Sequence, residues 1–192
     1  MSIPEVLCDR VFEAAEFVSA DFCKQMIARA HELGFEEAMI NTERGVEAIP
    51  DIRNNDRVVF DDPALASSFW WKVKPSFSAS FNGAVAVGLN ERFRLYRYHP
   101  GHFFDWHQDG EYRSAEGGVS RFTMMVYLNE GFEGGGTSFA DVFSPFRFAD
   151  FTIRPATGKA LFFHHPLSHR GDPVLSGVKY ALRTDVMFDA AG

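Results

Sequence analysis

Cysteine and positive charge are both scarce in this sequence of 192 residues. The two cysteines, Cys8 and Cys23, lie near the N-terminus and do not make a disulfide framework, which predicts a reducing compartment. The formal net charge is −7, so the chain lacks the basic face with which a nucleic-acid-binding protein contacts phosphates. We therefore expect no nucleic-acid partner.

Long apolar runs are missing as well. Runs such as Met124 to Leu128 are too short to cross a bilayer. The N-terminal stretch carries acidic residues that do not suit a secretory signal; these are Glu5, Asp9, Glu13 and Glu16. We expect a soluble cytoplasmic protein without a membrane partner, and the sequence leaves its oligomeric state open.

The first third of the chain is predicted to be helical. Ser19 can cap a helix that ends at Gly34. A second helix is predicted to begin at Pro63, after a cap at Asp61 or Asp62, because proline suits the first helical position. We expect both helices to brace one sheet of the domain.

From about residue 91 the apolar pattern changes to a period of two. This change predicts short strands, which are separated by turns rich in glycine and proline. The chain also has 21 phenylalanines, whose flat side chains suit a layered β structure. Together these features favour a β-sandwich or jelly roll.

The predicted last strand, residues 179–188, has two different faces. One face is apolar, whereas the other carries charge at Lys179, Arg183 and Asp185. Taken alone, this pattern favours a charged face that points to solvent. The alternative is a face that lines a polar cavity inside a barrel.

The motif with the most chemical content is His107-Gln108-Asp109. On a strand, residues i and i+2 point the same way, so the imidazole of His107 and the carboxylate of Asp109 converge. A second histidine would complete the two-histidine, one-carboxylate set that binds Fe(II) and leaves positions open for a cosubstrate and O₂. An H-x-D motif alone is weak, because chance often produces it.

Three later histidines are candidates for the remaining ligand. His169 follows the apolar run 161–163, as a residue at a strand end does, and it is the favoured ligand. His164 and His165 are adjacent and point to opposite faces of an extended chain, so one of them is expected to pack or to support a ligand.

Two cations are candidates for binding the distal carboxylate of a cosubstrate. Lys179 and Arg183 have the same strand parity, so both can face one cavity. Four residues of strand separate them by roughly 13 Å, too far for both to hold one carboxylate. The residues alone leave the choice open.

Between residues 98 and 188, several motifs follow one another in a fixed order. They are Tyr98-His99-Pro100-Gly101 with Phe104 and His107-Gln108-Asp109; Thr123 with Tyr127-Leu128-Asn129; Gly134-Gly135-Gly136-Thr137-Ser138-Phe139; and Pro155, Gly158, residues 160–163, His169, Pro173-Val174, Gly177 and Lys179. In order and spacing this series resembles the prolyl 4-hydroxylase-like branch of the 2-oxoglutarate/Fe(II)-dependent dioxygenase superfamily. The first 90 residues match that branch only loosely.

The resemblance implies a mainly β fold, a double-stranded β-helix or jelly-roll barrel with N-terminal supporting helices. We predict a single domain over residues 1–192, with helical support and loops in 1–90 and the catalytic core in 91–189. The implied activity is that of an oxidoreductase that needs Fe(II), 2-oxoglutarate and O₂.

The resemblance also assigns roles to individual residues. It implies metal binding by His107, Asp109 and His169, with no catalytic residue beyond these ligands. It implies that Lys179 and the Tyr127 hydroxyl bind the distal carboxylate of 2-oxoglutarate, and that Tyr98 lies near its chelating end. Arg183, which collagen-type members lack, remains a rival for the cosubstrate.

The substrate is predicted only by class. A hydroxylase of a peptidyl substrate, such as a prolyl peptide, or of a small molecule is expected. Related halogenases have a small residue where this chain has Asp109, which favours hydroxylation. Candidate substrate contacts are Arg53, Asn55 and Arg57 in a polar loop, and Arg121, although a solvated turn also explains the loop.

Two other functions fit parts of the sequence. One is a cupin-like metal-binding barrel with a non-oxygenase activity, which would need no 2-oxoglutarate. The other is a catalytically silent binding module that keeps the fold.

Overall fold

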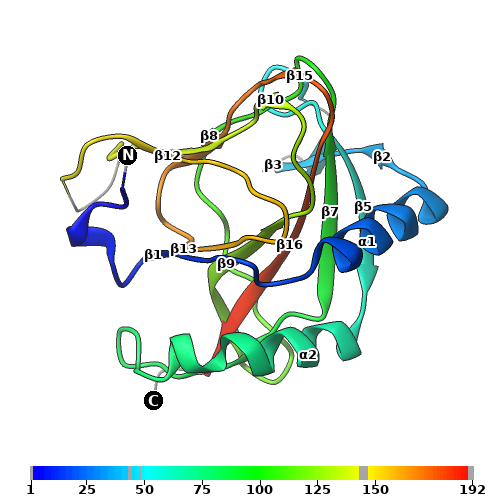
Figure 1. The fold of residues 1–192 in the computed structure, drawn as a ribbon. Coiled ribbons are helices and arrows are strands. Elements are labelled where there is room, and N and C mark those ends of the chain that lie inside the picture. The colour runs from blue at the N-terminus through cyan, green and yellow to red at the C-terminus, as the bar shows by residue number, and fades with distance from the viewer. Residues whose placement is uncertain (1, 43–44, 48, 143–146, 190–192) are drawn as a thin grey trace.

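The structure is a computed structural model that describes residues 2–42, 45–47, 49–142 and 147–189. Most strands of this part form two sheets, one large and one small, and two α-helices lie beside the large one (Figure 1). The helices are α1 (Ala20–Leu33) and α2 (Pro63–Val73), and short 3-10 turns occupy Glu5–Leu7 and Lys74–Phe77.

The large sheet contains eight strands in the described ranges. They are β1 (Val11–Ala14), β2 (Glu36–Glu37), β5 (Asp56–Asp61), β6 (Ala86–Leu89), β7 (Arg92–Tyr98), β9 (Val119–Tyr127), β13 (Ala160–His164) and β16 (Lys179–Phe188). Their order is β1-β13-β9-β16-β7-β5-β2, and β6 also pairs with β16. All of these pairs are antiparallel.

The small sheet has the order β12-β11-β14-β8. Its strands are β8 (Phe104–His107), β11 (Thr137–Phe139), β12 (Phe151–Ile153) and β14 (His169–Gly171). Two strand pairs stand apart, β3 (Ile40–Thr42) with β4 (Gly45–Glu47) and β10 (Glu133–Gly134) with β15 (Val174–Ser176). Neighbours in each sheet come from distant parts of the chain, as in a jelly roll. The predicted mainly β jelly-roll barrel with supporting helices is confirmed.

Both helices begin where the sequence predicts. The Ser19 hydroxyl accepts a hydrogen bond from the Phe22 amide at 3.1 Å, and Gly34 ends α1 with a φ of 87°. At α2 the cap is Asp62, whose carboxylate accepts from the Leu65 amide at 2.9 Å. Within the described ranges, no helix has both the length and the apolar character needed to cross a membrane.

The two larger apolar clusters among the described residues hold the sheets in place. The outer core joins α1 and α2 to the large sheet and includes Met26, Phe69, Phe93, Phe122 and Leu182. The inner core lies between the two sheets, where aromatic and aliphatic side chains of both meet; it includes Tyr127, Phe139, Phe151, Leu161 and Phe163. The helices therefore brace the outer side of the large sheet and leave its inner face free to line a site.

The two faces of β16 are buried against different parts of the molecule. Leu182 and Val186 pack in the outer core, whereas Lys179 and Asp185, on the opposite face, are buried at 2% and 3% exposure. The expectation that this charged face points to solvent is wrong, because the small sheet covers it. The alternative, a polar lining inside a barrel, is the correct one.

Candidate metal and cosubstrate site

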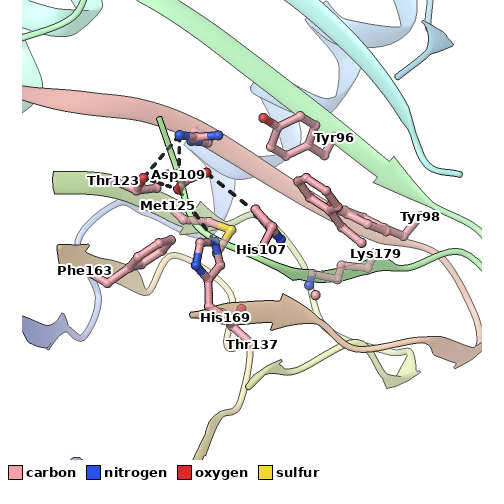
Figure 2. Close-up of a pocket in the computed structure, with 13 residues that line it drawn as sticks. Tyr96, Tyr98, His107, Asp109, Thr123, Met125, Thr137, Phe163, His169 and Lys179 are labelled. Carbon is pink, nitrogen blue, oxygen red and sulfur yellow. Dashed lines mark hydrogen bonds and ion pairs between the residues drawn. The ribbon is translucent and has the colours of Figure 1, made fainter. Parts of the chain in front are cut away.

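A pocket lies between the two sheets and collects side chains from both (Figure 2). The large sheet contributes Tyr96, Tyr98, Thr123, Met125, Phe163, Lys179 and Arg183, and the small sheet and its loops contribute Phe104, His107, Asp109, Thr137, His169 and Gly171. The inner faces of β7, β9 and β16 align because Tyr98 pairs with Lys179 and Ala181 pairs with Tyr127.

His107, Asp109 and His169 meet in this pocket. Pairing of β8 with β14 places His169 directly opposite His107, and Asp109 follows His107 by two residues. The Nε2 atoms of His107 and His169 lie 3.8 Å and 3.6 Å from the two carboxylate oxygens of Asp109. The potential ligand atoms of the three residues all lie within 4.8 Å of one another. The structure thus brings together the three residues that the sequence predicts to bind metal.

Backbone carbonyls fix the orientation of both imidazoles. The Nδ1 atom of His107 lies 2.6 Å from the Asp105 carbonyl, and that of His169 lies 2.9 Å from the Leu167 carbonyl. A carbonyl only accepts, so each Nδ1 carries the proton and donates it. Each Nε2 is then left with a free lone pair, which is the tautomer that a metal ligand needs.

Burial keeps the two imidazoles neutral. It lowers the pKa of His107 to about 3, an effect to which the neighbouring His169 adds. Burial also lowers the pKa of His169, against the attraction of the Asp109 carboxylate. At neutral pH both rings can therefore donate a lone pair without first losing a proton.

The carboxylate of Asp109 is held in its charged form. Burial alone would raise its pKa, but the Arg183 guanidinium and the two imidazoles hold it below the ordinary value. Arg183 Nη2 lies 3.1 Å from Oδ2, and the Thr123 hydroxyl donates to the same oxygen at 2.5 Å. The site therefore supplies one fixed anion and two neutral nitrogen donors.

Lys179 and Arg183, the two candidate cations, differ in how they are paired. Arg183 Nη2 contacts two carboxylates, Asp109 at 3.1 Å and Asp185 at 3.2 Å. Lys179 Nζ donates to the Gly135 carbonyl at 2.6 Å, and among the described residues no carboxylate lies within 4 Å of it. Burial lowers the pKa of Lys179 to about 8. Of the two candidate cations, Lys179 is thus the one without a carboxylate within 4 Å, and Asp172 acts on its pKa only from farther away.

Phenols and a hydroxyl surround Lys179. Its ammonium lies 5.0 Å from the ring centroid of Tyr98 and 5.6 Å from that of Tyr127. The Tyr127 hydroxyl shares a hydrogen bond of 2.7 Å with Thr137 Oγ1. Burial raises the pKa of both phenols, so they stay protonated and can donate.

The predicted substrate residues have different surroundings. The Arg53 guanidinium lies over the pocket-lining rings of Tyr96 and Phe104, and the fully buried Asn55 accepts a hydrogen bond from its Nε at 2.7 Å. Arg57 lies on β5 opposite Tyr96. Arg121 is not among the residues that line the pocket.

Neither of the other two histidines joins the triad. His164 packs its ring against Phe81 and Phe122. His165 is buried, with Nε2 at 3.7 Å from Asp185 Oδ1. His169 is therefore the histidine whose Nε2 faces Asp109 beside His107.

Sequence reasoning missed several residues of the pocket, including Phe104, Thr123 and Tyr96. Phe104 stacks on His107 with ring centroids 3.5 Å apart. Thr123 holds the Asp109 carboxylate. Tyr96 has the strand parity of Tyr98, and this signal was available in the sequence.

The geometry agrees with comparisons to known proteins. A family model described as the 2OG-Fe(II) oxygenase superfamily matches residues 93–184, which contain all three residues of the triad. The matched part of the chain is similar to members of this oxygenase superfamily. Within it the likeness is to the prolyl 4-hydroxylase-like branch, so a cupin-like barrel or a silent module is not favoured.

One curated relative is named “Putative prolyl 4-hydroxylase” and comes from Acanthamoeba polyphaga mimivirus. It is 27% identical over 149 residues, which are 68% of this chain and 56% of the viral protein. The match therefore spans little more than half the length of that relative.

Solved structures share the fold over nearly the whole chain. The viral collagen prolyl hydroxylase of Paramecium Bursaria Chlorella virus-1 has a TM-score of 0.63 at 23% identity, covering 94% of this chain and 97% of its own. A Pseudomonas putida prolyl-4-hydroxylase has a TM-score of 0.71 at 17% identity, covering 94% of each chain. A Trichoplax adhaerens prolyl hydroxylase, solved with a hypoxia inducible factor peptide, has a TM-score of 0.73 at 15% identity, with coverages of 95% and 85%. At these identities the likeness shows a common fold.

Proposed function

We propose that this chain is an Fe(II)- and 2-oxoglutarate-dependent dioxygenase that hydroxylates a small-molecule or peptidyl substrate. The observation that carries the proposal is that a potential metal site and a buried cation lie in one pocket. A triad of two neutral imidazoles and one carboxylate lies in the same pocket as Lys179, a buried cation with no carboxylate within 4 Å among the described residues.

The residues of the triad suit ferrous iron. Imidazole and carboxylate are the ligands of the two-histidine, one-carboxylate set typical of non-haem Fe(II) oxygenases. The Nε2 atoms of His107 and His169 are free of other hydrogen bonds in the described structure, because the bonds to Asp105 and Leu167 use Nδ1. His107, Asp109 and His169 would thus hold the ion.

Iron, 2-oxoglutarate and O₂ together supply the oxidising chemistry that hydroxylates a C–H bond, with succinate and CO₂ as co-products. Asp109 occupies the position that halogenases leave to a halide, which supports hydroxylation. Phe104, Met125 and Phe163 line the pocket beside the triad and keep water from its apolar walls.

We assign the distal carboxylate of 2-oxoglutarate to Lys179, with the hydroxyls of Tyr127 and Thr137 as neighbouring donors. An incoming carboxylate would give Lys179 the counter-charge that it lacks. Arg183 is the weaker candidate, because Asp109 and Asp185 already neutralise it. The Lys179 ammonium lies 5.0 Å from the ring centroid of Tyr98, and Tyr98 lines the same pocket, which supports a position for it beside the bound cosubstrate.

Anaerobic spectroscopy tests the assignment of the metal ligands. Fe(II) with 2-oxoglutarate should give the wild-type protein a weak visible charge-transfer band, and admission of air should release succinate. His169→Ala should lose both signals, because it removes one of three ligands. His164→Ala is the matched control and should keep both, since its ring packs against phenylalanines outside the triad. Absence of the band and of succinate in the wild type would overturn the proposed function.

We also propose that the protein works in the cytoplasm and that the whole chain acts as one oxygenase domain. The free state of Cys8 and Cys23 supports a reducing compartment. The pairing of β1 with β13 and of β5 with β7 supports one domain, because it ties the N-terminal third to the strands of the site.

A further inference from the structure

Arg53, Tyr96 and Arg183 each bury a polar atom that has no hydrogen-bond partner among the described residues. These atoms are Nη2 of Arg53, the hydroxyl of Tyr96 and Nε of Arg183. Arg53 is 6% exposed and Tyr96 is 4% exposed. An unpaired buried polar group costs about 1–3 kcal/mol, and native proteins contain few of them. The three side chains lie close to one another, because the phenol of Tyr96 interacts with both guanidinium groups. Their unpaired atoms leave hydrogen-bonding capacity that a bound ligand can use.

The three side chains gather at one end of the pocket. The guanidinium carbon of Arg53 lies 4.8 Å from the ring centroid of Tyr96 and 4.4 Å from that of Phe104, and both rings line the pocket. Tyr96 is on the inner face of β7, two residues from Arg94, which pairs with Arg183 on β16.

This end of the pocket is separate from the end at Lys179. Figure 2 draws Tyr96 and Lys179 on opposite sides of His107. On β16, Lys179 and Arg183 are four residues apart, which corresponds to roughly 13 Å. A cosubstrate anchored at Lys179 would therefore leave the end at Arg183 to a different carboxylate, or would reach it only with its chelating end.

Positive charge exceeds negative charge at this end. Arg53 donates to the uncharged Asn55 side chain, and Arg57 donates to the Met39 carbonyl at 3.3 Å. Among the described residues, neither arginine has a carboxylate within 4 Å. The two carboxylates nearby, Asp109 and Asp185, are both shared with Arg183.

The pKa values of two neighbouring groups reflect this excess. Burial raises the pKa of the Tyr96 phenol, yet the guanidinium groups of Arg183 and Arg53 outweigh burial, and the pKa lies below its ordinary value. The pKa of Arg57 is lowered by burial and then by the like charge of Arg53. The local field thus favours an anion.

We propose that Arg53 and Tyr96, beside Arg183, bind the carboxylate of a small substrate, so that this oxygenase acts on a small carboxylic acid such as a free amino acid. Arg183 itself stays paired with Asp109 and Asp185. The proposal rests on the proposed function and names its substrate class. A carboxylate accepts several hydrogen bonds at once and matches the planar donors of a guanidinium. Because Arg53 and Tyr96 are almost fully buried, the acid group must enter the pocket, which favours a small molecule over the middle of a peptide chain.

Ligand-induced thermal stabilisation tests this proposal without turnover. The protein is loaded with Mn(II) and saturating 2-oxoglutarate, and a panel of free amino acids and small aliphatic and aromatic acids is added, each alongside its carboxamide. A ligand that binds only the folded state raises the Tm. At least one acid should raise it, and its carboxamide should not. Absence of any preference for an acid over its amide would overturn the proposal.

Variants then identify the residues that bind the acid. Tyr96→Phe removes only the hydroxyl, and Arg53→Gln removes the charge. Each should weaken binding of the selected acid by roughly tenfold or more, as expected for a lost hydrogen bond to a charged group. Arg29→Gln is the control, because Arg29 is also partly buried but pairs with Asp62 and does not line the pocket, and it should bind the acid as the wild type does.

The same variants show whether these donors bind the substrate or the cosubstrate. If Tyr96→Phe and Arg53→Gln weaken 2-oxoglutarate binding and leave that of the acid unchanged, the donors serve the cosubstrate and the proposal is wrong. If no acid binds but the anaerobic band and succinate release remain, the proposed function stands while this substrate class fails. Tyr96→Phe keeps the aromatic ring, so it still tests the proposal if Arg53→Gln does not fold.

Discussion

At the scale of single residues, the pairing of charges decides which cation is free to bind a ligand. Lys179 and Arg183 share a strand face and cannot be ranked from the sequence. In the structure, Arg183 is bound to Asp109, in the segment after β8, and to Asp185 on its own strand, whereas Lys179 has a carbonyl as its hydrogen-bond acceptor. The difference depends on contacts across strands, which strand parity does not reveal.

Substitution of the two cations should therefore affect different kinetic constants. We expect Lys179→Ala to raise the KM for 2-oxoglutarate by roughly tenfold or more, because a charge-assisted hydrogen bond is lost. Arg183→Ala should mainly lower kcat and metal affinity, because Arg183 holds the Asp109 carboxylate. Steady-state kinetics with varied 2-oxoglutarate and varied Fe(II) will distinguish them. A larger KM effect in Arg183→Ala would reverse the assignment.

The pH dependence should report the same lysine. Burial lowers the pKa of Lys179 to about 8, so its ammonium is charged below that pH and loses its charge as the pH rises through it. Because kcat/KM reflects the free enzyme, its value for 2-oxoglutarate should fall above about pH 8. Lys179→Arg, with a guanidinium that stays charged, should keep a flat profile there. An unchanged fall in Lys179→Arg would assign the titration to another group.

At the scale of elements, periodicity predicts the faces of β16 but not their surroundings. Alternation separates Leu182 and Val186 from Lys179 and Asp185 correctly. Which face meets solvent depends on the small sheet, whose strands come from distant parts of the chain. Local pattern therefore predicts the strand, whereas tertiary packing decides that its charged face is buried.

Helix starts were predictable because their signals are local, and α2 offers a test. Asp62 accepts from the Leu65 amide and from Arg29 Nη1 at 2.6 Å. Asp62→Ala should lower the free energy of unfolding by about 1–2 kcal/mol, mostly through the lost cap. The control Asp21→Ala removes an exposed pair with Lys24 and should cost at most about 0.5 kcal/mol. Urea unfolding measures both.

Acid should remove the contribution of Asp62. The hydrogen bond from Arg29 lowers the pKa of Asp62 in the folded protein. Its contribution is therefore complete above the unfolded value of about 4 and is lost as the pH falls through the lower folded pKa. The difference in unfolding free energy between wild type and Asp62→Ala should shrink in that range. A difference independent of pH would mean that the charge of Asp62 contributes nothing.

At the scale of the whole molecule, the sequence predicted the catalytic half better than the supporting half. Several of the motifs between Tyr98 and Lys179 contribute side chains to the pocket, among them His107, Asp109 and His169. The N-terminal part was predicted mainly as helices and loops, yet β1 and β2 are strands of the large sheet. Short strands such as β1 have too few residues to show a period of two, so only their long-range pairing reveals them.

We expect that residues 91–192 cannot fold without the N-terminal helices and strands. A chain of residues 91–192 would lack both helices and also β1 and β5, which pair with β13 and β7. It would expose apolar residues of the outer core, including Phe93, Phe122 and Leu182. Exposing each such side chain to water costs about 1.5–3 kcal/mol of folding free energy. Summed over the cluster, this cost would exceed the 5–15 kcal/mol by which a domain is stable. We expect circular dichroism and NMR to show an unfolded or aggregated chain.

In the full-length protein, Phe69→Ala should only lower stability, by about 3–5 kcal/mol, and keep the anaerobic band. A folded 91–192 chain that binds 2-oxoglutarate would mean that the first 90 residues are not part of the same cooperative unit.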